Sequence, residues 1–527
     1  MRQRFVNSSS RRVNFFLVWA ALASCLVFHA PSPTEAANRT LLMADDHHIL
    51  TRPGAEHVLH SPRRHELNPL IKTTKPWEQA IGYCSVHRNE QTGKYQLWYQ
   101  AYSPKAKEAT HRVVVAYAES DDGLRWVKPN LGLYSYDGQS NTNITLIGNG
   151  GRSTNYGAAV LYDPRDSDAG RRYKMAYWDF PTPDAVAAGG NPAPGLFVAF
   201  SEDGLQWRKH LDLALLQADY GDLGQPPLAS DSGDANFTRP AISDVIDLMY
   251  DPPRETFVIY AKTWIDGPDG RQFWKRAVVR TESQDFIHWS RPELVMAPDA
   301  REAGQLHGAP VFFRHGMYFG LVQTLDFGGF DSGGTGDMPS ELAASRDGRR
   351  WTRPFRQTPF ISVRGDGSSF DAGCLWTNAM PIDHGDEIRF YYSAYPSWNA
   401  DIENGGTGIG LAVMQRDRLI GLRPIAEIAQ VTLKPMSLAD VRKITVNAAG
   451  GAVRVELLNV SGERMPGFSM QDSIAIEGDS LEGEVRWQKA AMDDLQPGLY
   501  QIRIHLDDAE LFAITLDSQR DSHGVNR

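Results

Sequence analysis

Short apolar runs alternate with polar turns along most of the chain, and one kind of run recurs five times. Each copy is eight residues of mainly aromatic, β-branched and other apolar types, which is typical of a β-strand. The copies stand at 95–102, 173–180, 257–264, 318–325 and 388–395. A turn precedes these runs, and another apolar run precedes the turn. The pattern predicts a β-hairpin in each of five units.

A second signature follows each of these strands. It reads Asp-Gly-Leu-Arg-Trp at 122–126, with related copies at 203–207, 285–289, 347–351 and, in degenerate form, 417–421. The distance from the first residue of the strand to the last residue of the signature is 31, 34, 32, 33 and 33 residues. Because an Asp-Gly turn closes a hairpin and the Trp begins the next strand, each unit is predicted to be a four-stranded antiparallel meander.

Five such meanders in succession predict a β-propeller, since radial repetition shields the strand edges. Units of roughly 60–85 residues are too long for most solenoid repeats. We therefore predict an all-β fold, a five-bladed β-propeller followed by a C-terminal β-sandwich. The propeller is expected over 77–424, with blades near 77–135, 152–212, 238–296, 305–358 and 371–424, the β-sandwich over 425–517 and a tail over 518–527.

The N-terminus has the features of an export signal, which predicts a secreted or periplasmic protein. Residues 1–36 combine four arginines, an apolar stretch at 15–28 and a small-residue cleavage site before Ala37. An alternative is a lipoprotein anchored through Cys25, because residues 22–25 resemble a bacterial lipobox. No later segment is long and apolar enough to span a bilayer. Residues 37–76 are expected to pack on the propeller.

The charge, the cysteines and the absence of a metal-binding spacing limit which partners, disulfides and cofactors we expect. The net charge of −10 argues against nucleic acid, which needs clustered Lys and Arg. Cys84 and Cys374 fall in neighbouring blades, so one bridge is an alternative to the two buried thiols that we expect. No metal-binding spacing is present, so no cofactor is expected, although the pattern leaves open a structural Ca²⁺ in the channel.

The predicted topology places candidate site residues at one end of the channel. Each inner strand starts at the axis on one face, and the second strand returns to that face. Inner-strand starts and the loops after the second strands should therefore meet there. They supply Trp77, Glu78, Asp179, Arg239, Asp244, Trp264, His307, Asp326, Asp371, Trp376 and Trp398.

Carboxylates and aromatic rings together suit sugar chemistry. Glycosidic cleavage needs one carboxylic acid to protonate the leaving oxygen and a second carboxylate to attack or to activate water. Glu78 and Asp244 are the predicted catalytic pair, and Asp179 is the third, charge-tuning acid. The predicted substrate-binding residues are Trp77, Arg239, Trp264, His307, Asp326, Asp371 and Trp398. An alternative for each Asp is a turn or cap role, which is common near strand ends.

The chain resembles the sugar-active five-bladed propeller superfamily that includes glycoside hydrolase families 32, 43 and 130. Residues 68–70, 75–78 and 95–99 are similar to the first blade of such proteins, and residues 409–412 with Arg416-Asp417 are similar to a fifth blade of family-32-like bacterial proteins. Residues 446–450 and 467–469 resemble the β-sandwich that those proteins append.

The resemblance implies three acids from the first three blades, and here the chain departs from it. The Asn-Asp-Pro motif of family 32 is absent, and Glu78 is the nearest acid. The second-blade Arg-Asp-Pro motif is not in its usual place, since Asp163-Pro164 lies at a hairpin turn instead. The third-blade Glu-Cys pair is missing, and Asp244 is the nearest acid there. The resemblance therefore predicts the fold better than the catalytic residues.

Three functions follow as hypotheses. The leading one is a glycoside hydrolase acting on a plant or algal oligosaccharide or polysaccharide. The second is a propeller that binds carbohydrate without catalysis. The third is a glycoside phosphorylase, which would need a cluster of Arg, Lys or His for phosphate beside the acids; the sequence offers Arg239 and His307.

Overall fold

The computed structural model describes residues 38–150, 157–217, 241–267, 274–299, 302, 304–326, 336–377, 380–398 and 406–518. The predicted export signal, the lipobox and Arg239 lie outside these residues, as does the tail beyond 518. Among the described residues, no helix has the length and apolar character needed to cross a membrane.

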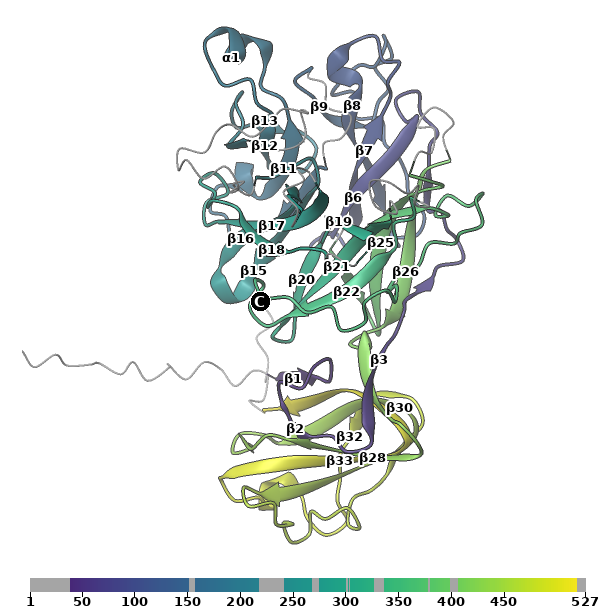
Figure 1. Ribbon diagram of the computed structural model, residues 1–527, viewed down its shortest axis with the longest axis vertical. Helices are drawn as coiled ribbons and strands as arrows, with labels where there is room; N and C mark the ends of the chain where they lie inside the picture. Colours follow the sequence, from purple (N-terminus) through teal and green to yellow (C-terminus); the bar gives the residue numbers. More distant parts are fainter. Residues whose placement is uncertain are drawn as a thin grey trace, which may run out of the picture.

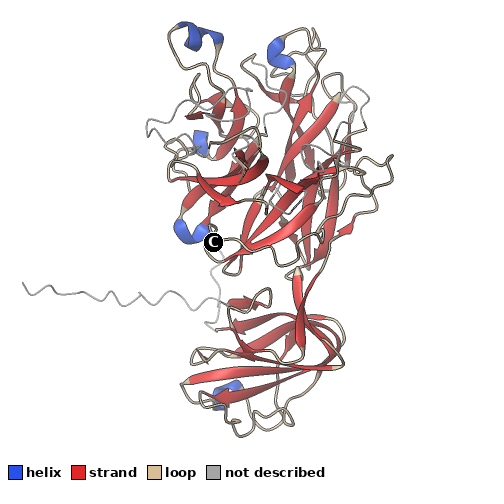
Figure 2. Ribbon diagram, viewed as in Figure 1, coloured by secondary structure: helices blue, strands red, loops and turns tan. Residues whose placement is uncertain are grey.

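The fold is almost entirely β-structure (Figure 2). Its helical segments are short connections between strands: η1 (Ala109–His111), η2 (Ala169–Arg171), α1 (Pro183–Ala187), η3 (Pro252–Arg254) and η4 (Met492–Asp494). Figure 1 shows a larger body of antiparallel sheets and a smaller β-domain beside it.

The larger body is a five-bladed β-propeller, as the repeat predicts. Blade 1 contains β6 (Ala80–Arg88), β7 (Tyr95–Tyr102), β8 (Val113–Ser120) and β9 (Ile144–Ile147). Blade 2 contains β10 (Ala159–Tyr162), β11 (Tyr173–Asp179), β12 (Gly195–Ser201), β13 (Arg208–Lys209) and β14 (Leu216–Gln217). Blade 3 contains β15 (Ile246–Asp251), β16 (Thr256–Ile265), β17 (Lys275–Ser283) and β18 (Glu293–Met296).

Blades 4 and 5 have interrupted inner strands. Blade 4 contains β19 (Gly304–Gly308), β20 (Val311–Arg314), β21 (Met317–Asp326) and β22 (Ser340–Ser345). Blade 5 contains β23 (Cys374–Trp376), β24 (Ile382–His384), β25 (Glu387–Tyr395) and β26 (Gly408–Gln415), and β26 pairs with the N-terminal strands β4 (Arg63–Arg64) and β5 (Ile71–Lys72). The outer edge of blade 5 is thus supplied from the start of the chain, which closes the ring.

The Asp-Gly turns connect neighbouring blades. In three of them, an aromatic side chain of the preceding blade donates a hydrogen bond to the glycine carbonyl; the pairs are Trp98–Gly204, Tyr260–Gly348 and Tyr391–Gly123, at 2.6, 2.8 and 2.9 Å. The last pair joins blade 5 to blade 1. All three glycines have positive φ, and a Cβ at each would approach its aromatic partner to within 2.5–2.9 Å, so glycine is required there.

Asp371 belongs to the closure of the ring rather than to a substrate site. Its carboxylate is fully buried and accepts hydrogen bonds from Arg64 on β4 (2.6 Å), from Arg364 (2.9 Å) and from Tyr392 (2.9 Å). These contacts tie the N-terminal strand to blade 5. The prediction that Asp371 binds substrate does not fit this geometry.

The smaller domain is one continuous ten-stranded sheet around a single apolar core. Its strands are β1 (Arg39–Leu42), β2 (Ile49–Thr51), β3 (Ala55–Leu59), β27 (Ile420–Pro424), β28 (Ile428–Leu433), β29 (Met436–Ser437), β30 (Lys443–Asn459), β31 (Ile476–Glu477), β32 (Ser480–Glu484) and β33 (Leu499–Asp517). Residues 39–59 therefore pair within this sheet, whereas the sequence predicted that they pack on the propeller. The degenerate fifth signature leads into β27, so the chain leaves the propeller before residue 424.

Cys84 and Cys374 are both buried and free, as expected. Burial raises the pKa of the Cys84 thiol to about 12, which makes it a poor nucleophile.

Candidate functional site

Asp244 and Lys262 form an ion pair where the inner strand of blade 3 begins. Asp244 lies two residues before β15, and Lys262 lies on β16. The Lys262 side chain is buried, whereas 30% of the Asp244 side chain is exposed. Ser243 donates a further hydrogen bond to Asp244 (3.0 Å). The site thus contains a carboxylate that solvent or a ligand can reach, held by a buried ammonium group.

The charges around Asp244 keep it ionised. Burial raises the pKa of Asp244, but Lys262, His307 and Ser243 lower it by more than burial raises it. The pKa of Asp244 therefore falls to about 2. Burial, Lys262 and Arg276 together hold the pKa of His307 well below its usual value. At neutral pH the site therefore holds an ionised aspartate, paired with Lys262, and a neutral imidazole.

Aromatic side chains from blades 3 and 5 frame this cluster. The guanidinium of Arg276, on β17, lies 4.5 Å from the ring centre of Trp264 and 5.5 Å from that of Trp398. The ring of His307 meets Trp398 edge-on at 5.2 Å. The cation thus lies near two indole rings, and one of them, Trp398, contacts the buried imidazole.

Residues of blades 1 and 5 also contact the cluster. The Tyr83 hydroxyl lies 3.4 Å from Nε2 of His307, and the Tyr83 and Trp376 rings are 5.6 Å apart. Tyr83 has a positive φ of 46° at a β-bulge in β6, which turns its side chain relative to the regular strand. We call Asp244, Lys262, Arg276, His307, Tyr83, Trp264, Trp376 and Trp398 the axial cluster.

Five of the predicted residues meet in this cluster: Asp244, Trp264, His307, Trp376 and Trp398. Sequence reasoning missed Lys262, Arg276 and Tyr83. Lys262 had a visible signal, because it is the one charged residue in the apolar run 257–264. Arg276 and Tyr83 carry no such signal.

Glu78 and Trp77 lie in a closed network inside blade 1. The Glu78 side chain is fully buried and accepts from Tyr99 (2.6 Å), Lys128 (2.7 Å) and the backbone N–H of Thr74 (2.8 Å). Trp77 is buried in the core and donates its indole N–H to Asn143. These contacts give both residues a structural role, and the predicted Glu78–Asp244 catalytic pair does not fit them.

Asp179 is buried at the end of β11 in blade 2. It accepts from its neighbour Phe180 (backbone N–H, 2.8 Å) and from the backbone N–H of Asn149 (3.0 Å). Burial raises the pKa of Asp179 to about 6 in spite of these bonds and of nearby Lys209. This is a carboxyl group poised between its acid and base forms near neutral pH.

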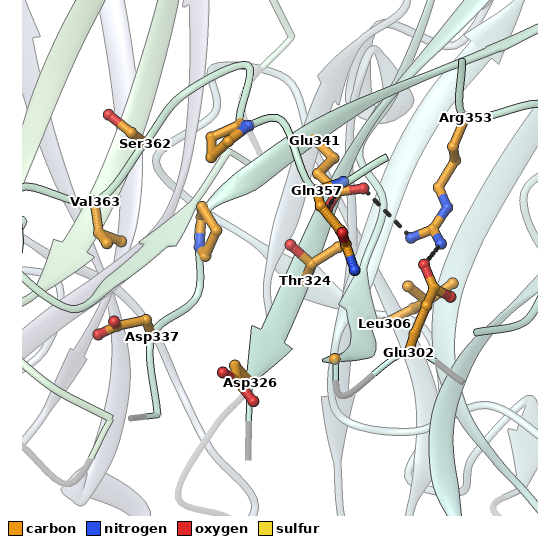
Figure 3. A pocket seen from close by; sticks show the side chains of 13 residues that line it. Glu302, Leu306, Thr324, Asp326, Asp337, Glu341, Arg353, Gln357, Ser362 and Val363 are labelled. Carbon is orange, nitrogen blue, oxygen red and sulfur yellow. Dashed lines mark hydrogen bonds and ion pairs between the residues drawn. The ribbon is translucent and has the colours of Figure 1, made fainter. Parts of the chain in front are cut away.

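Asp326 lies in a separate pocket on blade 4 (Figure 3). The pocket has a volume of about 400 Å³, and Asp326 and Asp337 lie together on one side of it. Arg353 forms ion pairs with Glu302 and Glu341 on the other side. Among the residues that the structure describes, no group of His, Cys, Asp and Glu side chains is arranged to hold a metal ion.

Asp247, on the inner strand of blade 3, is another buried acid. Asp247 on β15 accepts from the backbone N–H of Ala309 (3.1 Å), and a Cβ on Gly308 would lie 3.1 Å from Asp247 and 2.8 Å from Gln323. Within the described part of the chain, Oδ1 of Asp247 and both amide atoms of Gln323 have no hydrogen-bond partner. Burial raises the pKa of Asp247 to about 8, so it stays protonated at neutral pH.

Replacing Asp247 with Asn is expected to change how stability depends on pH. The unfolded chain releases the Asp proton near pH 4, roughly its usual pKa, and the folded protein releases it only near pH 8. Between these values the folded state binds more protons, so wild-type stability falls as pH rises, by at most about 1.4 kcal/mol per pH unit. The Asn variant lacks this loss. Denaturant unfolding at pH 5 and pH 8 measures the difference, and parallel curves would contradict it.

Sequence comparisons show no match: no family model fits the chain, and no curated protein matches it. Solved structures with a similar arrangement include an N-acetylgalactosamine deacetylase from F. plautii in complex with blood group B trisaccharide. It is 17% identical with a TM-score of 0.42, over 68% of this chain and 96% of that one. A glycosyl hydrolase from Bacteroides ovatus is 16% identical with a TM-score of 0.42, over 69% and 95%.

A third similar structure is a glycoside hydrolase family 43 arabinoxylan arabinofuranohydrolase from Bacillus subtilis in complex with cellotetraose. It is 12% identical with a TM-score of 0.40, over 87% of this chain and 99% of that one. These likenesses establish no activity for this chain. The five-bladed propeller itself rests on the strand pairing described above.

Proposed function

We propose that the chain is a glycoside hydrolase whose reacting carboxylate is Asp244. The observation that supports this most directly is a partly exposed, ionised Asp244 at the start of an inner strand, paired with Lys262 and next to His307. The same His307 contacts Trp398 and lies near the guanidinium of Arg276. Asp244 would attack the anomeric carbon or activate a water molecule there. A plant or algal oligosaccharide or polysaccharide remains the proposed substrate.

The aromatic frame would bind the sugar. Indole rings offer an apolar face to the C–H groups of a pyranose or furanose. Arg276 donates to Gln305 (2.7 Å), which fixes the guanidinium near Trp264 and Trp398. Lys262 and the Ser243 hydroxyl hold the Asp244 carboxylate in place, so one orientation of the carboxylate is fixed before substrate binds.

Asp179 is the proposed proton donor, because it ends β11 at the end of blade 2 where the inner strand β10 begins, the same end of the propeller at which Asp244 precedes β15. Its pKa of about 6 suits a group that must carry a proton and then release it. Turnover would require ionised Asp244 and protonated Asp179. Activity is therefore expected to stay level in mildly acid solution and to fall above about pH 6. Asp179→Asn should lower kcat/KM about 100-fold and remove the fall at high pH. A variant that keeps the same high-pH limb would rule out this role.

The activity itself can be tested with the full-length protein on a panel of plant and algal polysaccharides, by measuring newly formed reducing ends. Release of sugars that Asp244→Asn abolishes would support hydrolysis. Tight binding of a polysaccharide without any release would favour the non-catalytic binding propeller instead.

A glycoside phosphorylase is the second candidate, because the cations Lys262 and Arg276 and the neutral imidazole of His307 belong to the same cluster as Asp244. Cations near the reacting carboxylate could bind a phosphate nucleophile. The sequence offered Arg239 and His307 for that role. The same assay distinguishes the two functions when it is run with and without inorganic phosphate. Phosphate-dependent formation of a sugar 1-phosphate would select the phosphorylase, and phosphate-independent release would select the hydrolase.

A further inference from the structure

A pocket of about 400 Å³ lies where the N-terminal strand β5 closes the ring on blade 5. It is separate from both the axial cluster and the blade 4 pocket, and shares no lining residue with either. Its volume falls within the range of small-molecule sites, roughly 300–1,000 Å³. Polar residues, an aromatic ring and two cations line it: Lys72, Thr73, Arg364, Ser369, Phe370 and Thr407.

Lys72 and Arg364 have hydrogen-bond donors that could bind a ligand. Lys72 is exposed, and its ammonium group has no partner among the described residues. Arg364 uses Nε to bind Asp371 (2.9 Å), and its side chain is 43% exposed. Its terminal nitrogens have no partner within the described part of the chain. Nearby Asp371 is already bound by Arg64, so it does not cancel both charges.

Asp366, like Asp371, lies close to this pocket without lining it, and its charge acts on Arg364. It is fully exposed and accepts hydrogen bonds from the backbone N–H and the hydroxyl of Ser369. Solvent screens its charge more than it screens charges inside the pocket. The lining itself is therefore cationic, in a protein whose net charge is −10.

The pocket also has the features that hold a sugar ring. Phe370 stacks on Tyr392 with the ring planes 15° apart and the centroids at 6.0 Å, so its ring is fixed in position while it stays half-buried. The hydroxyls of Thr73 and Ser369 can bond to sugar hydroxyls. An aromatic face, hydroxyls and free cationic donors in one cavity suit a sugar that carries an anionic group.

The location connects this pocket to the proposed reaction. Lys72 pairs with Gly408 at the start of β26, and Phe370 lies four residues before β23. Both positions are at the end of blade 5 where its inner strand begins, which is the end of the propeller that carries Asp244. A polymer bound at the axial cluster can therefore extend along this face to the pocket.

We propose that the blade 5 pocket binds an anionic sugar unit, a uronate or a sulfate ester, of an acidic polysaccharide. Lys72 and Arg364 bind the charged group, and Phe370 packs against the sugar ring. This deepens the proposed function by naming acidic polymers as the substrate class. Binding at this pocket does not itself need turnover.

Calorimetry with the full-length protein tests the proposal with four probes: an oligogalacturonate tetramer, a sulfated galactan tetrasaccharide, neutral xylotetraose and sodium sulfate. At least one of the two acidic tetramers should bind, and the one that binds names the anionic group. Lys72→Glu should weaken that binding about 10-fold or more, as expected for the loss of a charge-assisted contact. Lys443→Glu, at an exposed position in the smaller domain, is the matched control and should change nothing.

Three outcomes would overturn the proposal: equal binding of xylotetraose, sulfate binding as tightly as the sulfated tetrasaccharide, or equal weakening by Lys443→Glu. Arg364→Gln supplies a second, independent loss of affinity. Repeating the titration with Asp244→Asn separates this site from the reaction. If that variant binds acidic tetramers normally, the pocket stands even if hydrolysis is never observed.

Discussion

Asp244→Asn should lower turnover at least ~100-fold, the loss expected when a positioned catalytic carboxylate is removed. The amide has nearly the same shape as the carboxylate and can still accept a hydrogen bond from Ser243, but it cannot act as nucleophile or base. Because the pKa of Asp244 is lowered to about 2, the wild-type carboxylate is ionised throughout the assay range, and the loss should be seen at every pH tested. Initial rates of reducing-end release on the substrate found in the panel measure it.

Asp326→Asn is the matched control, because it makes the same change in the blade 4 pocket. It should keep near-normal turnover if the reaction occurs at the axial cluster. Asp244→Asn also leaves buried Lys262 without its counter-charge, so the melting temperature must be measured alongside. A folded variant with full activity would reject Asp244 as the reacting group.

Glu78→Gln is expected to destabilise the protein by about 3 kcal/mol, because removing one partner of a buried ion pair strands the other. Lys128 would keep its charge in a half-buried position beside Tyr99, and two backbone N–H groups would lose a charged acceptor. Denaturant unfolding measures the change. Glu90→Gln, on an exposed turn, should cost close to nothing.

The same variant decides between two roles for Glu78. A structural role predicts normal turnover per folded molecule at low temperature, with a lowered unfolding midpoint. A catalytic role predicts the reverse: an unchanged midpoint and a large loss of turnover. The second pattern would show that the closed network around Glu78 opens during the reaction.

The repeat was enough to predict the propeller, because strand and turn chemistry are local properties. Five apolar runs at nearly constant distance from an Asp-Gly signature indicate five meanders whatever they pack against. The sequence did not predict that N-terminal strands β4 and β5 complete blade 5, or that β27 pairs with β3 in the smaller domain. Strands β4 and β5 are two residues long and carry no signature. Leu419 and Ile420 are as apolar as a blade strand, although the chain there enters the smaller domain.

The site was only partly predictable, because position along a strand does not say which way a side chain points. Asp244 and Glu78 both precede inner strands, yet one is partly exposed beside Lys262 and the other faces Tyr99. Charged residues within apolar strands are equally ambiguous. Lys262 pairs with Asp244 in the axial cluster, whereas Lys174, in the equivalent strand of blade 2, is buried in a structural pair with Asp166.

The most direct test is a crystal structure of Asp244→Asn with an oligosaccharide released from the best polysaccharide substrate. The axial cluster predicts a sugar ring against Trp264 and Trp398, with its anomeric carbon beside residue 244. Sugar density confined to the blade 4 or blade 5 pocket, with none at the axis, would contradict it.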